Sequence, residues 1–225
     1  MTKNITLALL ALIIFSGNAS AYVIGGLNAD AVYSREGNNT EGNASGYRTG
    51  LMLGYGFEHY YSALKLGLGS DNFSGASNAD QGQTDIELNV GYRLNPMLSA
   101  FIGYRNRSLD FNRTANAANP NPLKATERLN HFGLGAAMVY PLAPSWMFKA
   151  DINAYYLNSQ YENASFKNSG SGYSAGLSAG ILRTFKNGFN ASLTSKAQAS
   201  NTGYFTGGTY TDILGSLSLG VTKIF

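Results

Sequence analysis

The chain has 225 residues and a formal net charge of +3, with only 13% charged residues and no basic block, so the sequence does not favour nucleic acid as a partner. It has no Cys, which excludes a disulfide framework, and its 27 Gly, 15 Tyr and 12 Phe favour strands over helices. The mean hydropathy of −0.13 does not exclude a membrane protein, because transmembrane strands alternate apolar and polar side chains and average to neutral.

Residues 1–21 have the pattern of a secretory signal peptide. Lys3 supplies a positive charge near the start, residues 5–15 form an apolar run, and Ala19-Ser20-Ala21 fits a cleavage site of small residues. The apolar run of about 11 residues is shorter than the roughly 20 that a membrane-spanning helix needs. We therefore expect residues 1–21 to be removed and the mature domain to cover 22–225.

Alternating apolar and polar residues predict ten strands in the mature domain. The predicted strands cover 22–35, 46–57, 60–70, 84–94, 98–111, 126–140, 146–158, 171–185, 189–199 and 210–225. Short turns alternate with loops of about 10 to 14 residues, the layout of a barrel with an even number of strands. Eight strands is the alternative, in which 22–35 and 189–199 lie outside the wall. All five prolines fall in the predicted connections, as expected because Pro cannot donate to a sheet ladder.

The last predicted strand alternates most clearly. One parity is apolar and the other polar or small: Ile213, Leu217, Leu219, Val221 and Phe225 against Asp212, Ser216, Ser218, Gly220 and Thr222. Ser218, Gly220 and the C-terminal Phe225 fill three of the four positions of a closing-strand signal, and Lys223 fills the position that is usually aromatic. The strand thus resembles the assembly signal of Gram-negative outer-membrane β-barrel proteins.

This resemblance implies a closed antiparallel transmembrane β-barrel in the cell outer membrane, with the short turns and both termini on the periplasmic side. It also implies contact with outer-membrane lipids, lipopolysaccharide and the outer-membrane assembly machinery. We leave the oligomeric state open and expect a monomer. A secreted β-sandwich would alternate in the same way, but it would not need a closing Phe or two aromatic belts.

Aromatic residues gather near both predicted ends of the strands, as in the two belts of a transmembrane barrel. The predicted belt near the short turns contains Tyr60, Tyr92, Tyr140, Trp146, Phe148, Phe185, Phe189 and Phe225. The predicted belt near the longer loops contains Tyr33, Tyr47, Tyr104, Tyr156, Tyr173 and Tyr210.

Pairing across the short turns predicts the strand register. If Leu94 faces Leu98, opposite charges fall opposite each other as two expected ion pairs, Glu87 with Arg105 and Asp85 with Arg107. The same reasoning places Leu51 opposite Leu66, Met138 opposite Phe148, and Leu134 opposite Ile152.

The polar parity is expected to face the lumen. It carries a nearly balanced charge cluster of Asp85, Glu87, Arg93, Arg105, Arg107, Lys149 and Asp151. We expect these side chains to fill the lumen with salt bridges, because ten strands lie nearer the filled eight-stranded barrels than the open 16-stranded porins. The alternative is a narrow water path with a weak preference for anions. Inward glycines such as Gly91 and Gly133 are expected to allow curvature.

The family also includes proteases and lipid A-modifying enzymes, whose sites need a His near a carboxylate or a hydroxyl nucleophile. His59 falls in a short turn, and His131 is predicted to face inward with Tyr155 across from it and Arg107 on its other flank. Neither shows a paired nucleophile and base, so we expect no catalytic residue, no metal site and no cofactor. The expected function is a structural or surface-interaction role, with the narrow channel as first alternative and an enzyme as second.

Overall fold

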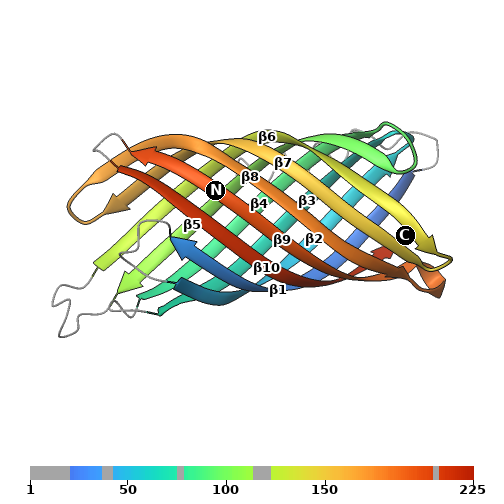
Figure 1. Ribbon diagram of the computed structural model, residues 1–225, viewed down its shortest axis with the longest axis horizontal. Coiled ribbons are helices and arrows are strands. Elements are labelled where there is room, and N and C mark those ends of the chain that lie inside the picture. Colours follow the sequence, from blue (N-terminus) through green and yellow to red (C-terminus); the bar gives the residue numbers. More distant parts are fainter. Residues whose placement is uncertain (1–20, 37–42, 75–78, 114–122, 205–207) are drawn as a thin grey trace.

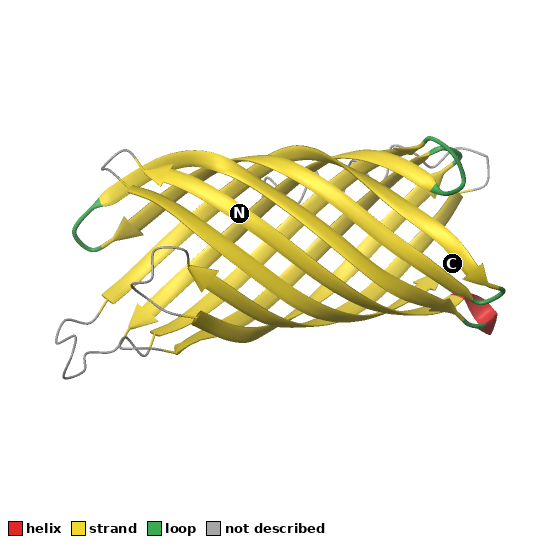
Figure 2. Cartoon of the chain, in the orientation of Figure 1, coloured by secondary structure: helices red, strands yellow, loops and turns green. Residues whose placement is uncertain are grey.

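Ten antiparallel strands form one closed sheet in this computed structural model, which describes residues 21–36, 43–74, 79–113, 123–204 and 208–225 (Figure 1). Each strand pairs with its neighbours in the chain, and β1 closes the barrel against β10. Figure 2 shows a wall built of strands, with the short 3-10 helix η1 (Lys186–Gly188) at one end. Closure leaves no free strand edge. The prediction of a ten-stranded barrel is confirmed.

The strands are long and strongly tilted. They are β1 (Ala21–Glu36), β2 (Asn43–Phe57), β3 (Tyr60–Ser74), β4 (Ala79–Arg93), β5 (Leu98–Arg113), β6 (Leu123–Ala143), β7 (Trp146–Asn163), β8 (Lys167–Thr184), β9 (Phe189–Tyr204) and β10 (Gly208–Ile224). No helix in these described segments is long and apolar enough to cross a bilayer. We call the end that carries the short turns the turn end and the opposite end the far end.

The predicted strand boundaries were within one residue at the turn end, except in β6, which ends at Ala143 instead of residue 140, and they were too short at the far end. Asn187 and Gly188 both have positive φ, which fits the short turn predicted between the strands 171–185 and 189–199. At the far end the ladder continues well beyond the predicted limits, for example to Asn163 in β7, so the predicted loops of 10 to 14 residues are wrong. Only 164–166 separate β7 from β8. The error arose because the outward face turns polar there, which removes the amphipathic pattern while the backbone pairing persists.

The predicted register is confirmed on either side of two short turns and is wrong at a third. Glu87 faces Arg105, Asp85 faces Arg107, and Leu51 faces Leu66. In contrast, β6 continues to Ala143 with an irregularity after Pro141, and its pairing with β7 differs by two residues from the predicted one; the observed pairs are Tyr140 with Phe148, Ala136 with Ile152, and Leu134 with Ala154. Because the side-chain period of a strand is two, this shift leaves every side chain on its predicted face.

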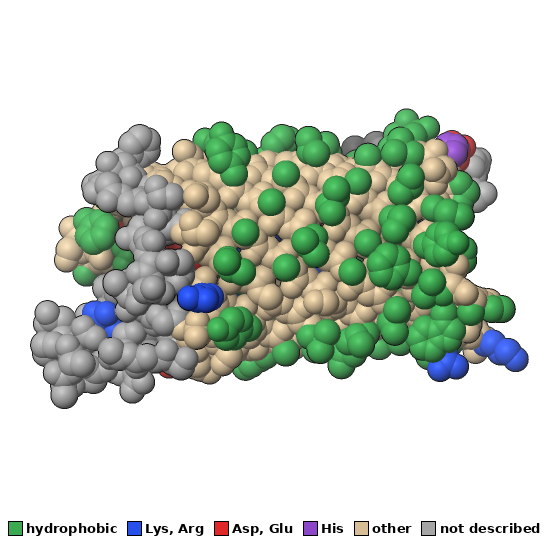
Figure 3. All heavy atoms as spheres, in the orientation of Figure 1, with side chains coloured by type: hydrophobic (Ala, Val, Ile, Leu, Met, Phe, Trp, Pro, Cys, Tyr) green, Lys and Arg blue, Asp and Glu red, His purple; other side chains and the backbone are tan. Residues whose placement is uncertain are grey.

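The outward face of the barrel is apolar between two aromatic belts. Figure 3 shows hydrophobic side chains spread over the wall, with Lys and Arg confined to its two ends on the face in view. The apolar parity of β10 is outward as predicted, and the exposed side chains include Leu27, Leu51, Leu68, Ile102, Leu134, Ile152, Leu177, Leu217 and Leu219. This arrangement suits contact with lipid rather than water.

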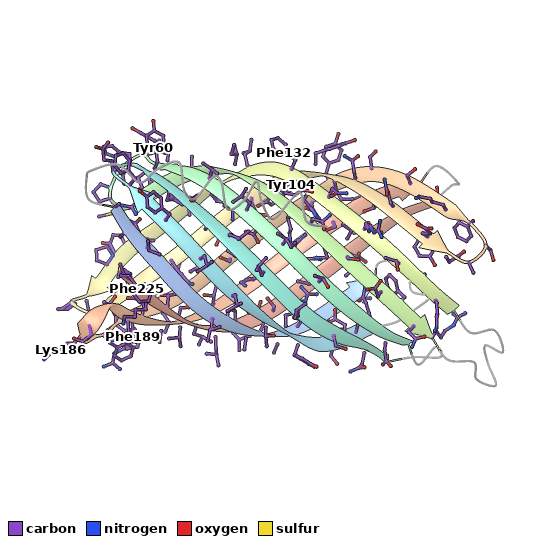
Figure 4. The ribbon with its side chains drawn as sticks, turned by 180° about the vertical axis from the view of Figure 1, so that it is seen from behind. Tyr60, Tyr104, Phe132, Lys186, Phe189 and Phe225 are labelled. Carbon is purple, nitrogen blue, oxygen red and sulfur yellow. The ribbon has the colours of Figure 1, made fainter. Side chains whose placement is uncertain are left out.

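The two belts mark the ends of this apolar band. Figure 4 shows Tyr60, Phe189 and Phe225 at the turn end and Tyr104 and Phe132 farther along the wall. Exposed members of the turn-end belt are Tyr60, Tyr92, Tyr140, Trp146, Phe185, Phe189 and Phe225, and those of the far belt are Tyr33, Tyr47, Tyr104, Phe132, Tyr156 and Tyr173. Phe132 was missed in the sequence, and the side chain of Tyr210 lies outside the described residues.

The wall continues beyond the far belt. On β7 the stretch from Trp146 to Tyr156 matches the roughly 9–11 residues that a tilted strand needs to cross a membrane, and the strand runs on to Asn163. We call the strand residues beyond the far belt the far-end extension. Its outward side chains are polar and include Ser108, Asp110, Thr126, Arg128, Asn158, Gln160, Ser169 and Ser171.

Hydrogen bonds join the outward polar side chains at and above the far belt. The Nδ2 group of Asn106 donates to Oδ1 of Asn130 at 2.8 Å, and the Tyr104 hydroxyl donates to the same oxygen at 3.0 Å. Farther out, the hydroxyl of Thr126 donates to Asp110 at 2.8 Å. The outer wall therefore changes from apolar to hydrogen-bonded polar side chains at this belt.

Candidate functional site

Charged side chains meet in the middle of the lumen around Asp85. The Nε group of Arg105 donates to both carboxylate oxygens of Asp85 at 2.8 Å, and a terminal guanidinium nitrogen of Arg105 also donates to that carboxylate. On its other side, Nη1 of Arg105 donates to Gln198 of β9 at 3.2 Å. Arg105 thus connects opposite walls of the barrel.

Of the two predicted ion pairs, Asp85 with Arg107 is confirmed and Glu87 with Arg105 is wrong, although the register behind both is right. Arg105 reaches diagonally to Asp85, while Glu87 pairs with Lys65 of β3, whose Nζ lies 2.7 Å from Oε1. Lys65 stands directly opposite Glu87 on the other neighbouring strand, which the turn-by-turn pairing did not consider. Long side chains can bridge diagonal neighbours in a sheet, so opposition alone does not decide the partner.

Further ion pairs extend this network. Arg107, only 7% exposed, places its Nε 3.6 Å from the Asp85 carboxylate, so that Asp85 lies between two guanidinium groups. Two more pairs, each at 3.3 Å, are Arg48 with Asp71 and Lys196 with Asp30. The lumen is held by charges that largely neutralise one another.

The other predicted members of the charge cluster are more scattered. Asp151 accepts hydrogen bonds from the Ser178 hydroxyl and from Asn153 Nδ2, and it lines the same cavity as Asp85. Arg93 and Lys149 face inward nearer the turn end and do not line that cavity. The guanidinium of Arg93 instead lies 5.0 Å from the centre of the Tyr22 ring.

Two cavities inside the barrel are lined by described residues. The larger, of about 200 Å³, is lined by the charged network in the middle of the lumen, and the smaller, of about 70 Å³, lies toward the far end. Arg48, Gln83, Arg107 and Gln198 border both cavities. These side chains therefore stand between the two spaces.

An inward apolar cluster borders the smaller cavity. It consists of Leu109, Leu129 and Leu157, with Phe111 packed against it, and Leu157 is only 1% exposed. Sequence reasoning missed this cluster because it assigned the inward parity to polar residues along the whole strand. A signal was present in β5, where the inward parity changes from Arg to Leu and Phe while the outward parity changes from Ile and Tyr to Ser and Asp.

Inward aromatic rings lie against glycines directly opposite them on neighbouring strands. Among the described residues such pairs are Tyr22 with Gly56, Tyr61 with Gly91, Phe101 with Gly135, and Tyr155 with Gly133. A Cβ atom on any of these glycines would overlap the facing ring or come much closer to it than van der Waals contact allows. The predicted role in curvature is therefore incomplete, because these glycines also allow an aromatic ring to approach the backbone.

His131 lies inside the far half of the barrel and is 1% exposed. Its ring centre is 6.1 Å from that of Tyr155, at nearly right angles, although the residues directly opposite His131 are Leu157 on β7 and Arg105 on β5. Together with Arg107 it borders the smaller cavity. Over the described part of the chain, no group of three or more His, Cys, Asp or Glu is placed to hold a metal ion.

The closing strand places its predicted signal residues as expected from their parity. Ser218 and Gly220 face inward, and Phe225 faces outward with its N–H donating to the Val23 carbonyl at 2.9 Å. Lys223, which replaces an aromatic residue of the signal, lies with its Nζ 5.1 Å from the ring centre of Phe189 and 4.9 Å from that of Phe225. A cation over two rings takes the place of a third ring.

Removing the Phe225 side chain is expected to impair assembly. Phe225→Ala should at least halve the heat-modifiable, folded fraction in membranes, because it removes the terminal ring of the closing strand. Phe185→Ala, which removes another exposed ring of the turn-end belt, is the matched control and should have a smaller effect. Equal losses would show that belt aromatics act alike and that the terminal position has no separate role.

Comparisons with known proteins point to one family. Residues 6–180 match the model of the outer membrane protein β-barrel domain. The fold is similar to that of the outer membrane protease OmpT from Escherichia coli, with a TM-score of 0.62 and 9% identity over 91% of this chain and 96% of that chain. It is also similar to the β domain of the Bordetella autotransporter BrkA, with a TM-score of 0.54 and 11% identity over 88% and 98% of the two chains. No curated protein matches the chain. At these identities the solved structures show a shared fold alone.

Proposed function

The chain belongs to the outer membrane protein β-barrel domain family and lies in the cell outer membrane, and on this premise we propose that it is a closed-lumen barrel with a structural or surface-interaction role. The family places short turns in the periplasm and longer connections outside the cell. The turn end then faces the periplasm, and the far-end extension projects from the outer surface.

The observation that carries this proposal is the filled lumen. Arg105 connects β4 and β9 through Asp85 and Gln198, and Arg107 separates the two cavities. Beyond them the cluster of Leu109, Leu129 and Leu157 adds an apolar layer that hydrated ions cross only at a cost. A barrel with a filled lumen is better suited to hold the far-end extension rigidly than to let solutes pass through.

The far-end extension offers surfaces for such a role. At the tip of the β7–β8 hairpin, Oδ1 of Asn163 accepts hydrogen bonds from the N–H groups of Ser165 and Phe166 at 2.8 and 3.0 Å. Phe166 stacks on Tyr161 with ring centres 5.6 Å apart and remains 53% exposed. An ordered tip with an exposed ring on a rigid barrel is a suitable place for recognition.

A narrow path for small anions is the second candidate function. The polar cavity of about 200 Å³ favours it, since Arg48, Arg105 and Arg107 all line that space. We propose no catalytic role. The absence of a catalytic role is proposed because His131 is only 1% exposed, which leaves a substrate no direct approach to its ring from solvent.

Planar-bilayer recording of the refolded protein tests these readings. We expect no conductance, because the charged network and the leucine cluster occupy the lumen. Small anion-favouring steps that disappear in Arg107→Gln but persist in Arg93→Gln, the matched lumen charge outside the cavity, would favour the channel. Stable conductance in the nanosiemens range would contradict a filled lumen.

A further inference from the structure

Two shallow grooves lie on the lipid-facing wall in the half of the barrel nearer the turn end. The first, of about 450 Å³, runs over β1, β2, β3 and β10 between Leu51, Leu53 and Phe225. The second, of about 580 Å³, runs over β7 to β10 and β1 and is bordered by Trp146 and Leu193. Leu27 and Val221 belong to both linings, so the grooves adjoin and these two side chains form the ridge between them.

Small outward residues create the grooves. Gly25 stands opposite Lys223 on β10 and Leu53 on β2, and Ala191 stands opposite Val221 on β10 and Arg183 on β8. Large side chains surround both positions, so each small residue leaves a depression in an otherwise apolar surface. A Cβ on Gly25 would meet its nearest atom, on the Phe225 ring, at an ordinary 3.5 Å, so close packing does not require glycine there.

Each groove has a basic side chain at the side nearer the turn end of the barrel. Lys223 lines the first groove, held between the rings of Phe189 and Phe225. Arg183 lines the second, with its Cζ 5.2 Å from the Trp146 ring centre and 5.0 Å from that of Phe185. Neither lining contains Asp or Glu. Both cations thus lie at the level of the turn-end aromatic belt, where lipid headgroups meet the hydrocarbon. Figure 4 shows Phe189 and Phe225 together at that level, with Lys186 just beyond them.

We propose that this double groove binds one phospholipid with an anionic headgroup from the periplasmic leaflet. Its two acyl chains lie on either side of the ridge formed by Leu27 and Val221, and its phosphate lies between Lys223 and Arg183. A second copy of the chain is a poorer occupant, because a two-fold contact on this surface would bring Lys223 and Arg183 near their own copies. A lipid phosphate complements both cations, and acyl chains complement the apolar lining.

Native mass spectrometry tests the proposal. The refolded full chain is released from vesicles of phosphatidylglycerol and phosphatidylcholine in equal amounts, and the lipid that stays bound is identified. We expect one retained lipid, enriched in phosphatidylglycerol. Lys223→Gln and Arg183→Gln should each reduce this enrichment about fivefold, since a basic residue near anionic lipid contributes on the order of that factor. Arg128→Gln, on the outward face at the opposite end, is the matched charge control and should leave it unchanged.

A second pair of variants tests the grooves separately from the charges. Gly25→Leu with Ala191→Leu fills both depressions and should lower total lipid retention at least fivefold, while Ala154→Leu, at a small outward position outside the grooves, should not. The heat-modifiable band shift verifies that each variant is folded. Equal retention of the two lipids by the unchanged protein, retention that survives groove filling, or a lipid-free dimer lost on groove filling would each overturn the proposal.

Discussion

Gly133→Ala is expected to prevent most molecules from folding, whereas Gly91→Ala should lower the folded fraction only while the Tyr61 side chain is present. A Cβ on Gly133 would overlap the Ala154 carbonyl oxygen and lie 2.7 Å from the Tyr155 Cα, so the backbone of β7 would have to move. At Gly91 the three nearest atoms all belong to the Tyr61 side chain, which can rotate away. Overpacking that forces side chains off their rotamers or shifts the backbone costs typically about 1–3 kcal/mol, and occasionally more.

The measurement is the folded fraction after refolding into vesicles, followed by the urea midpoint of the folded band. Tyr61→Ala should restore much of the folding lost in Gly91→Ala, while Tyr155→Ala should restore little in Gly133→Ala. Gly82→Ala is the control on the same strand as Gly91, because its nearest neighbour, the Asp110 carbonyl oxygen, is 4.0 Å away. If all three single variants fold equally well, close approach to these glycines is not a requirement of the barrel.

The closure of the barrel and the faces of its strands were predictable from the sequence because they depend on local patterns. A period of two assigns each side chain to lipid or lumen, and turn residues such as Asn187 and Gly188 mark where strands reverse. The predicted pairing of β6 with β7 was wrong by two residues, but an even shift leaves each side chain on its predicted face. The orientation of Leu217, Leu219 and Phe225 followed from parity alone.

The interior was only partly predictable because its contacts cross the barrel or run diagonally. Gln198 meets Arg105 from a strand far away in sequence, and the choice of Asp85 over Glu87 depends on Lys65 from a third strand. Alternation says that a side chain faces inward but not which of its inward neighbours it will contact. The glycine and aromatic pairs were hidden for a related reason, since their meaning appears only when both strands are aligned.

The height of the barrel was also missed. The amphipathic pattern ends where the outward face becomes polar, yet β7 and β8 continue as a paired ladder through that region. Backbone hydrogen bonding does not need an apolar face once the strand leaves the membrane. In β5 the inward residues change from polar to apolar between Arg107 and Leu109, and this inversion marks where the strand leaves the membrane. In similar chains such an inversion indicates that the strand continues beyond the membrane.

Removing Arg105 is expected to have the largest stability effect of any single charge in the lumen. Arg105→Met leaves Asp85 desolvated with only the more distant Arg107, and breaking a buried pair from one side costs about 3–5 kcal/mol. The double variant Arg105→Met with Asp85→Leu should recover most of this loss, because it leaves no unpaired charge.

Lys167→Gln is the control. Lys167 and Glu162 form an ion pair at 3.5 Å with side chains 62% and 59% exposed, and the loss of this pair should cost less than about 1 kcal/mol. Urea titration of the folded fraction in vesicles measures all three, and a loss in Arg105→Met no larger than that in Lys167→Gln would show that the lumen network does not stabilise the barrel.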